Sequence, residues 1–153
     1  MDWSPRTSED RMLFQYWEQV GGWVYTEVPI ARPQGDTLWS VASTTRRLDA
    51  VRFPGRYGEQ GIFPFSRNAS GFMSDVQTEL AWLIEVKPKI NRTAIGQVIA
   101  GTDLFQKQYG VAPAKLVIVC ASGDAALEWV CERRFIDVVK VAPQPGPLTR
   151  RAP

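Results

Sequence analysis

Hydrophobic and polar positions along the 153-residue chain switch between helical and strand-like spacing. Residues 8–20 are predicted to form a helix, because their apolar side chains recur every three or four positions. Thr7 can cap this helix, and Gly21 and Gly22 end it. Its apolar stripe consists of Met12, Leu13, Tyr16, Trp17 and Val20.

Strand-like patterns follow over residues 23–29, 47–53 and 79–86, the last of them apolar almost throughout. Residues 93–109 return to helical spacing. Beyond them, the sequence predicts a strand over 115–120, a short helix over 124–133 and a strand over 135–141. The order αβββαβαβ predicts an α/β fold: a mixed central sheet with flanking helices.

Glycine, proline and aromatic residues interrupt the pattern between residues 53 and 75. We expect a long excursion there, a surface loop or hairpin flap. Its aromatic side chains are expected to stack on bases or to pack against a second subunit. Residues 32–35 read as a loop, and the proline-rich residues 143–153 as a disordered tail. The aromatic residues are Phe53, Tyr57, Phe63, Phe65 and Phe72.

Composition narrows the possible chemistry. Hydrophobic residues make up 44% of the chain and charged residues 22%, as is ordinary for a globular protein, and the net charge is only +2. The length suits one domain, over residues 1–142. The chain has no histidine, so catalytic triads and histidine-ligated zinc are excluded. Cys120 and Cys131 stand in apolar surroundings and read as buried hydrophobic residues. No apolar run is long enough to cross a membrane and the first residues are acidic, so we expect a soluble, cytoplasmic protein.

Candidate chemistry lies in the segment LIEVKPKI, residues 83–90. Glu85 and Lys87 are two positions apart on a predicted strand, so both point to the same face. Asp49 lies on another predicted strand, and if the two strands pair, its carboxylate meets that of Glu85. Two facing carboxylates repel each other and therefore favour a hard divalent cation. The alternatives are a cross-strand ion pair for Glu85 and Lys87, and a solvated acid bonded to Arg46 or Arg47 for Asp49.

Asp49 followed by Glu85-Val86-Lys87 resembles the D…ExK signature of the PD-(D/E)xK nuclease superfamily. The predicted order of helices and strands also resembles the restriction-endonuclease-like core of that superfamily, which RecB-like nucleases and archaeal Holliday-junction resolvases share. The resemblance implies that Asp49 and Glu85 bind Mg²⁺ or Mn²⁺, that Lys87 is catalytic and that Gln97 is an accessory catalytic residue. It also implies a further acid near the first helix; the candidates are Glu9, Asp10, Glu18 and Glu27.

Two features depart from that signature. Leu48 stands where many members have proline, and the spacer before Glu85 is long, which makes Asp75 a rival for the first carboxylate. Asp49 is preferred because it lies within an apolar strand pattern.

The resemblance implies a metal-dependent endonuclease that hydrolyses DNA, expected to be a homodimer because cutting both strands needs two sites. Arg46, Arg47, Lys89 and Arg92 are expected to contact nucleic-acid phosphates, the alternative being simple solvation. Two other functions stay open: a nuclease-fold module that binds DNA or protein without cutting, and a structural domain with coincidental charges.

Overall fold

The computed structural model describes residues 3–31, 46–56 and 60–143. The predicted loop at 32–35, Tyr57 and nearly all of the predicted tail lie outside these ranges. Within them, the chain forms four helices and six strands. In chain order these are α1 (Ser8–Val20), β1 (Trp23–Pro29), β2 (Arg47–Phe53), β3 (Gly61–Pro64), α2 (Phe65–Thr78), β4 (Trp82–Lys89), α3 (Arg92–Tyr109), β5 (Lys115–Ser122), α4 (Ala125–Arg133) and β6 (Ile136–Lys140).

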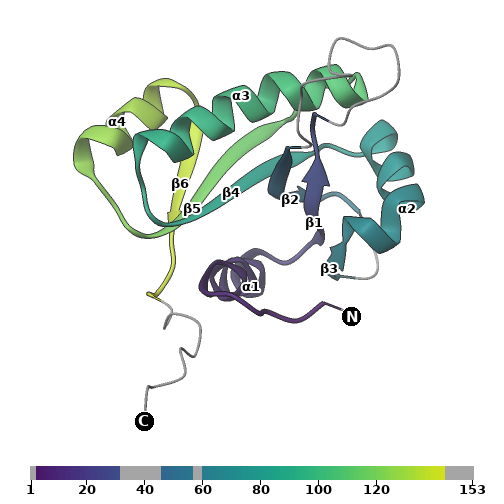
Figure 1. Cartoon of the computed structure of the whole chain (residues 1–153), viewed down its shortest axis with the longest axis horizontal. Helices are drawn as coiled ribbons and strands as arrows, with labels where there is room; N and C mark the ends of the chain where they lie inside the picture. Colours follow the sequence, from purple (N-terminus) through teal and green to yellow (C-terminus); the bar gives the residue numbers. More distant parts are fainter. Residues whose placement is uncertain (1–2, 32–45, 57–59, 144–153) are drawn as a thin grey trace.

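The six strands form one sheet in the order β3-β1-β2-β4-β5-β6 (Figure 1). β1 and β2 are antiparallel, as are β2 and β4, whereas β4, β5 and β6 run parallel and β3 lies parallel to β1. The predicted α/β class with a mixed sheet is therefore confirmed, and the arrangement is consistent with a restriction-endonuclease-like fold.

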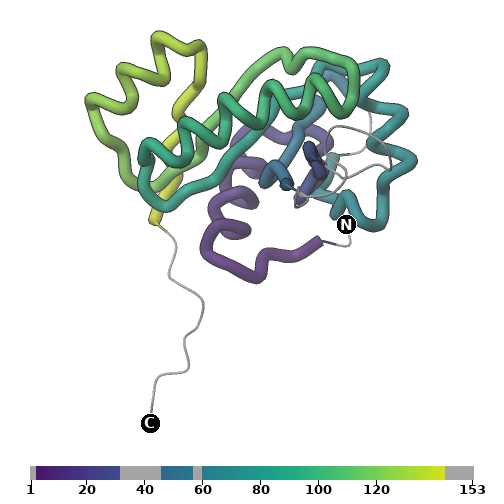
Figure 2. The backbone as a smooth tube through the Cα atoms, turned by 45° about the horizontal axis from the view of Figure 1, so that its top comes forward, coloured from purple at the N-terminus to yellow at the C-terminus, as the bar shows by residue number. Residues whose placement is uncertain are grey.

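Helices cover both faces of the sheet. Met12, Leu13 and Tyr16 of α1 pack on one face, in a cluster with Ile84 and Val86 of β4. The other face carries α2, α3 and α4, as their contributions to two further apolar clusters show. Figure 2 shows α1 and α3 on opposite sides of the strands. The candidate site described below thus lies within a sheet that helices hold from both sides.

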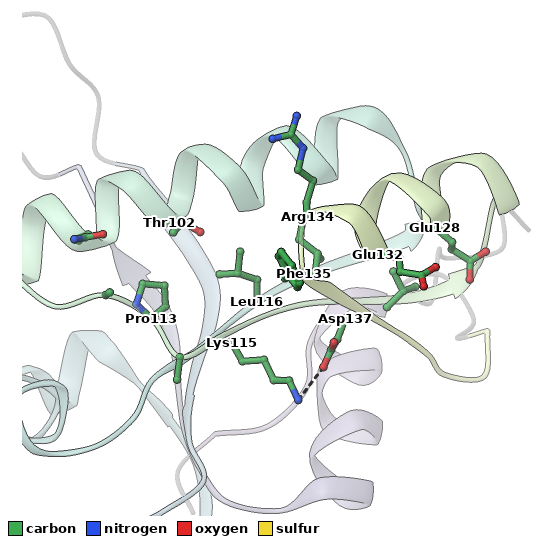
Figure 3. Close-up of a pocket in the computed structure, with 14 residues that line it drawn as sticks. Thr102, Pro113, Lys115, Leu116, Glu128, Glu132, Arg134, Phe135 and Asp137 are labelled. Carbon is green, nitrogen blue, oxygen red and sulfur yellow. Dashed lines mark ion pairs between the residues drawn. The ribbon is translucent and has the colours of Figure 1, made fainter.

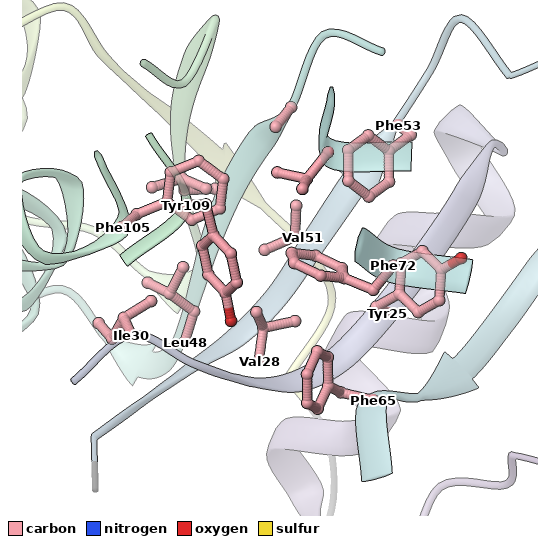
Figure 4. Packing of buried hydrophobic residues seen from close by; sticks show 13 residues of the cluster. Tyr25, Val28, Ile30, Leu48, Val51, Phe53, Phe65, Phe72, Phe105 and Tyr109 are labelled. Carbon is pink, nitrogen blue, oxygen red and sulfur yellow. The ribbon is translucent and has the colours of Figure 1, made fainter. Parts of the chain in front are cut away.

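The segment between residues 53 and 75 is not the loop or flap that the sequence predicts. Residues 61–64 form β3 along the edge of β1, and a helix with a kink at Asn68 follows at once. Phe53, Phe65 and Phe72 are buried, with 0%, 7% and 0% of their surface exposed, and pack against Tyr25 and Tyr109 (Figure 4). Expecting them to stack on bases or on a second subunit was wrong, because β2 turns Phe53 into the core and α2 turns Phe65 and Phe72 into it.

The start and end of β4 also differ from the prediction of 79–86. Glu79 ends α2 through its N–H, which donates to the carbonyl of Asp75. At the other end, the predicted strand stops at residue 86, but the observed strand continues through Pro88 to Lys89, beside Ser122 of β5. Proline lacks an N–H, and it fits here because β2 has already separated from β4 on its other side.

One arginine links α1 to the sheet. The guanidinium of Arg52 donates to the carbonyls of Gly21 and Val20 at 2.8 and 2.9 Å, and lies 4.7 Å from the ring of Trp82. Burial lowers the pKa of Arg52. These bonds satisfy carbonyl groups at the end of α1 and tie that end of the helix to β2.

Candidate active site

Asp49 and Glu85 meet where two central strands separate. The pairing of β2 with β4 runs from Arg52 opposite Trp82 to Ala50 opposite Ile84. One step further, Asp49 would stand opposite Glu85, but the ladder stops. There the Asp49 Oδ2 atom accepts the backbone N–H of Val86 at 2.7 Å. A side chain of β2 therefore replaces the main-chain partner that β4 has lost.

The regular alternation of side chains between the two faces of the sheet is interrupted in β1 and β2 at the same level, beside Asp49. Leu48 and Val51 lie in one apolar cluster although they are three residues apart, and Ala50 lies in the cluster on the α1 face. Strict alternation along β2 would put Leu48 and Ala50 on one face, whereas the structure puts them on opposite faces. In β1, the residue opposite Asp49 is Glu27, whose φ of 54° is a left-handed conformation that costs a non-glycine residue free energy.

Glu85 is almost completely buried, with 6% of its surface exposed. Burial, the charge of Asp49 and a hydrogen bond to that residue together raise the pKa of Glu85 to about 9, while the charge of Lys87 opposes the rise. At neutral pH without a cation, Glu85 is therefore protonated and shares a hydrogen bond with Asp49. A carboxyl pair of this kind gains from a cation that replaces the shared proton.

Glu9 is the acid of α1 that approaches this pair. Burial raises its pKa, followed by repulsion from Asp49, while Lys87 lowers it. Asp10, by contrast, accepts the N–H groups of Arg6 and Thr7 in a capping box at the start of α1. The structure thus distinguishes among the acids that the sequence left open, and places Glu9 beside Asp49 and Lys87.

A cleft of about 750 Å³ opens in front of Asp49. Glu9 and Asp10 of α1, Glu27 of β1 and Val86 of β4 line it on the same side as Asp49. Basic side chains line it as well, and they come from different elements: Arg6, Arg47 and Arg67. The lining of the cleft thus combines acids, which can bind a cation, with arginines, which can bind an anion such as phosphate.

The other predicted site residues are placed in different surroundings. Lys87 is partly buried on β4, and Arg46 is exposed just before β2. Lys89 and Arg92 line a separate hollow of about 490 Å³ next to the start of α4. Gln97 is exposed on α3 and lines none of the cavities described here. The structure therefore brings Glu85 together with Asp49 and Lys87, and Arg47 lines the same cleft as Asp49, although neither Glu85 nor Lys87 lines it. Gln97 and the pair Lys89 and Arg92 lie elsewhere.

Asp75, the rival for the first carboxylate, has other partners. It accepts the hydroxyl of Tyr25 at 2.6 Å and forms an ion pair with Arg56, also at 2.6 Å. The Arg56 guanidinium lies 3.6 Å from the ring centre of Trp23. This network ties α2 to β1, so the side chain of Asp75 holds the fold together, away from Glu85.

The alternative roles for these charges do not fit their surroundings. β4 is an inner strand, and among the described residues neither Glu85 nor Lys87 forms an ion pair. Asp49 likewise forms none with Arg46 or Arg47 and bonds to Val86 instead. Edge-strand pairing and simple solvation therefore account for neither carboxylate.

A second cavity, of about 680 Å³, lies between α3 and the strands β5 and β6 (Figure 3). Phe135 stands at its rim, 88% exposed and with a φ of 55°, and Lys115 forms an ion pair with Asp137 across its floor. None of the residues predicted to act in catalysis lines this cavity. It is separate from the carboxyl pair.

The donor groups fit a hard cation that keeps most of its own waters. In the described part of the chain, no three Asp, Glu, His or Cys side chains are arranged to hold a metal ion together. Mg²⁺, however, keeps several of its waters and is held by one or two carboxylates. Asp49 and Glu85 supply that number, both oxygen donors, in a place where their charges repel without a cation.

The fold and the site together define an α/β domain whose central strands separate around a carboxyl pair, in which Glu85 is buried and Asp49 is half-buried. No family model and no curated protein matches the chain. Among solved structures, it is similar to a repair endonuclease from Pyrococcus abyssi, with 15% identity and a TM-score of 0.49. The similarity covers 94% of this chain and 50% of that one, so the chain spans about half of that protein's length. No helix in the described ranges is long and apolar enough to cross a membrane.

Proposed function

We propose that this chain is a metal-dependent endonuclease that hydrolyses phosphodiester bonds in DNA. The observation that supports the proposal best is the carboxyl pair of Asp49 and Glu85 at the point where β2 and β4 separate. Lys87, on β4 like Glu85, is close enough to lower the pKa of Glu85.

The residues have distinct roles in this proposal. Asp49 and Glu85 hold Mg²⁺ or Mn²⁺, and the bond from Val86 N–H fixes the Asp49 carboxylate in place. Glu9 lies beside them and can accept a hydrogen bond from a water of the cation. Lys87 orients the attacking water and stabilises negative charge that develops on the phosphate. A bound divalent cation supplies Lewis-acid activation of water and of the phosphate.

One observation favours the rival function, a module that binds DNA or protein without cutting it. Only two carboxylates meet closely, and no cluster of three metal-binding side chains occurs among the described residues. Against it stands the burial of Glu85. An acid whose pKa is raised to about 9 by its surroundings lowers the stability of the fold at neutral pH. A protein that binds DNA by charge alone needs no such group.

A nicking assay on supercoiled plasmid, with Mg²⁺, with Mn²⁺ and with EDTA, tests the proposal. We expect nicking that requires the metal and falls by at least about 100-fold in Lys87→Ala and in Glu85→Gln. Lys107→Ala is the matched control, since it removes one exposed charge from the far part of α3.

Each outcome of that assay selects one function. Metal-dependent nicking that only the control variant retains supports the endonuclease. A gel shift of DNA without nicking favours the binding module, and neither nicking nor a shift leaves a structural domain. Because two sites are needed to cut both strands, we also propose that the protein is a homodimer. Mass photometry or analytical ultracentrifugation can test this proposal.

A further inference from the structure

The helix that the sequence did not predict forms one wall of the cleft. Four consecutive residues at the junction of β3 and α2 line it: Pro64, Phe65, Ser66 and Arg67. The segment before α1 adds Arg6. These residues face the same space as Asp49, yet they come from parts of the chain that carry none of the acids of the carboxyl pair.

Arg67 and Arg6 are available to a ligand. Both are exposed, and neither forms an ion pair with another described residue. Acids lie in the same cleft, but the ion pairs found in the described ranges use Arg56, Lys115 and Lys140 instead. The two guanidinium groups can therefore turn to an anion that enters the cleft.

A nucleic-acid strand brings such anions. The carboxyl pair and its cation act on one phosphate, while the phosphates on either side of it stay charged and need other cations. Guanidinium groups suit this task because they donate two parallel hydrogen bonds to phosphate oxygens.

We propose that Arg67, together with Arg6, binds the DNA phosphates that flank the cut, so that α2 is a substrate-binding wall of the cleft. This inference rests on the proposed function and deepens it. The sequence suggested Lys89 and Arg92 as phosphate contacts, but they line a different hollow. In this inference the phosphates are bound instead by arginines that line the cleft with Asp49.

The test measures binding of fluorescein-labelled DNA, single-stranded and duplex, by anisotropy at several salt concentrations. Lys87→Ala serves as the background, with EDTA present, so that binding is measured without cleavage. On it, Arg67→Ala is expected to weaken binding about tenfold and to lower the salt slope by roughly 0.7 to 0.9, the value of one lost phosphate contact. Arg67→Lys, which keeps the charge, is expected to recover part of both. Arg6→Ala should behave like Arg67→Ala, and Lys107→Ala should match the background.

The results separate this inference from the proposed function. If the background protein binds DNA but Arg67→Ala keeps its Kd and its salt slope, α2 is not a substrate wall, while the endonuclease proposal stands on its nicking assay. If the unsubstituted chain neither binds nor cuts either DNA, both proposals fail together. Circular dichroism and Tm of each variant show whether a loss of binding reflects a loss of fold, and at an unchanged Tm the loss supports the inference.

Discussion

Replacing Glu85 by glutamine should make the metal-free protein more stable at alkaline pH. Glu85 is 6% exposed, and burial, with Asp49 next in importance, raises its pKa from an ordinary 4.5 to about 9. Glutamine keeps the size of the side chain. Its neutral amide can donate to Asp49 as the protonated acid does, and it has no proton to lose.

The sign follows from which state holds the proton. Between the unfolded pKa of 4.5 and the folded pKa of about 9, the folded protein keeps a proton that the unfolded chain has released. The stability contribution is therefore complete below 4.5 and is lost as the pH rises through 9. A difference of one proton changes the free energy of unfolding by about 1.4 kcal/mol per pH unit, or about 4 kcal/mol between pH 5 and pH 8.

Urea unfolding in EDTA across that pH range measures the effect. The free energy of unfolding of the unsubstituted protein, minus that of Glu85→Gln, should fall steadily as the pH rises. All other titrating groups are common to both proteins and cancel to first order. Glu18→Gln, which removes an exposed acid of α1, should show no such slope relative to the unsubstituted protein. A flat difference between the Glu85→Gln protein and the unsubstituted one would refute the assignment of a buried, protonated carboxyl at this position.

A divalent cation should restore the stability that the metal-free protein loses as the pH rises. Since binding by Asp49 and Glu85 requires the proton to leave, Mg²⁺ or Mn²⁺ should raise the Tm of the unsubstituted protein more at pH 8 than at pH 6. The cation should leave the Tm of Glu85→Gln nearly unchanged. An equal rise in both proteins would place the cation somewhere else.

Four other substitutions test the fold and the limits of the site. Arg52→Ala should cost about 2 kcal/mol and lower Tm by roughly 4–8 °C, since the carbonyls of Val20 and Gly21 lose a charged donor; an unchanged melting curve would contradict that role. Phe72→Ala should cost about 3–5 kcal/mol in urea unfolding, which a surface position for base stacking would not. Asp75→Asn should lower Tm but leave nicking intact at temperatures where the variant is folded. Loss of nicking in the folded variant would mean that Asp75, and not Asp49, is the first carboxylate of the site. Gln97→Ala should nick plasmid within roughly twofold of the unsubstituted rate, whereas a direct catalytic role predicts a loss on the order of 100-fold.

Much of the fold is readable from spacing. The predicted bounds of α1, β1 and β2 agree with the structure, because the apolar period and the Thr7 and glycine boundaries are local signals. The spacing of apolar residues did not predict the secondary structure between residues 53 and 75, where Gly61 and Pro64 suggested a loop. They instead delimit a four-residue strand, and the burial of Phe72 depends on β1 and α3 being nearby.

The amino-acid sequence alone determined which groups are available for chemistry: acids at 49 and 85 within apolar strands, a lysine two positions after the second acid, and no histidine. Only the tertiary structure decided that β2 and β4 separate at that row, that Glu9 approaches from α1, and that Arg67 faces the same cleft while Gln97 does not. The physical reason is that periodicity reports which face a residue takes within its own element. Strand register, the break in alternation at Glu27 and the placement of helices depend on contacts between distant residues, and those contacts set the distances on which the site depends.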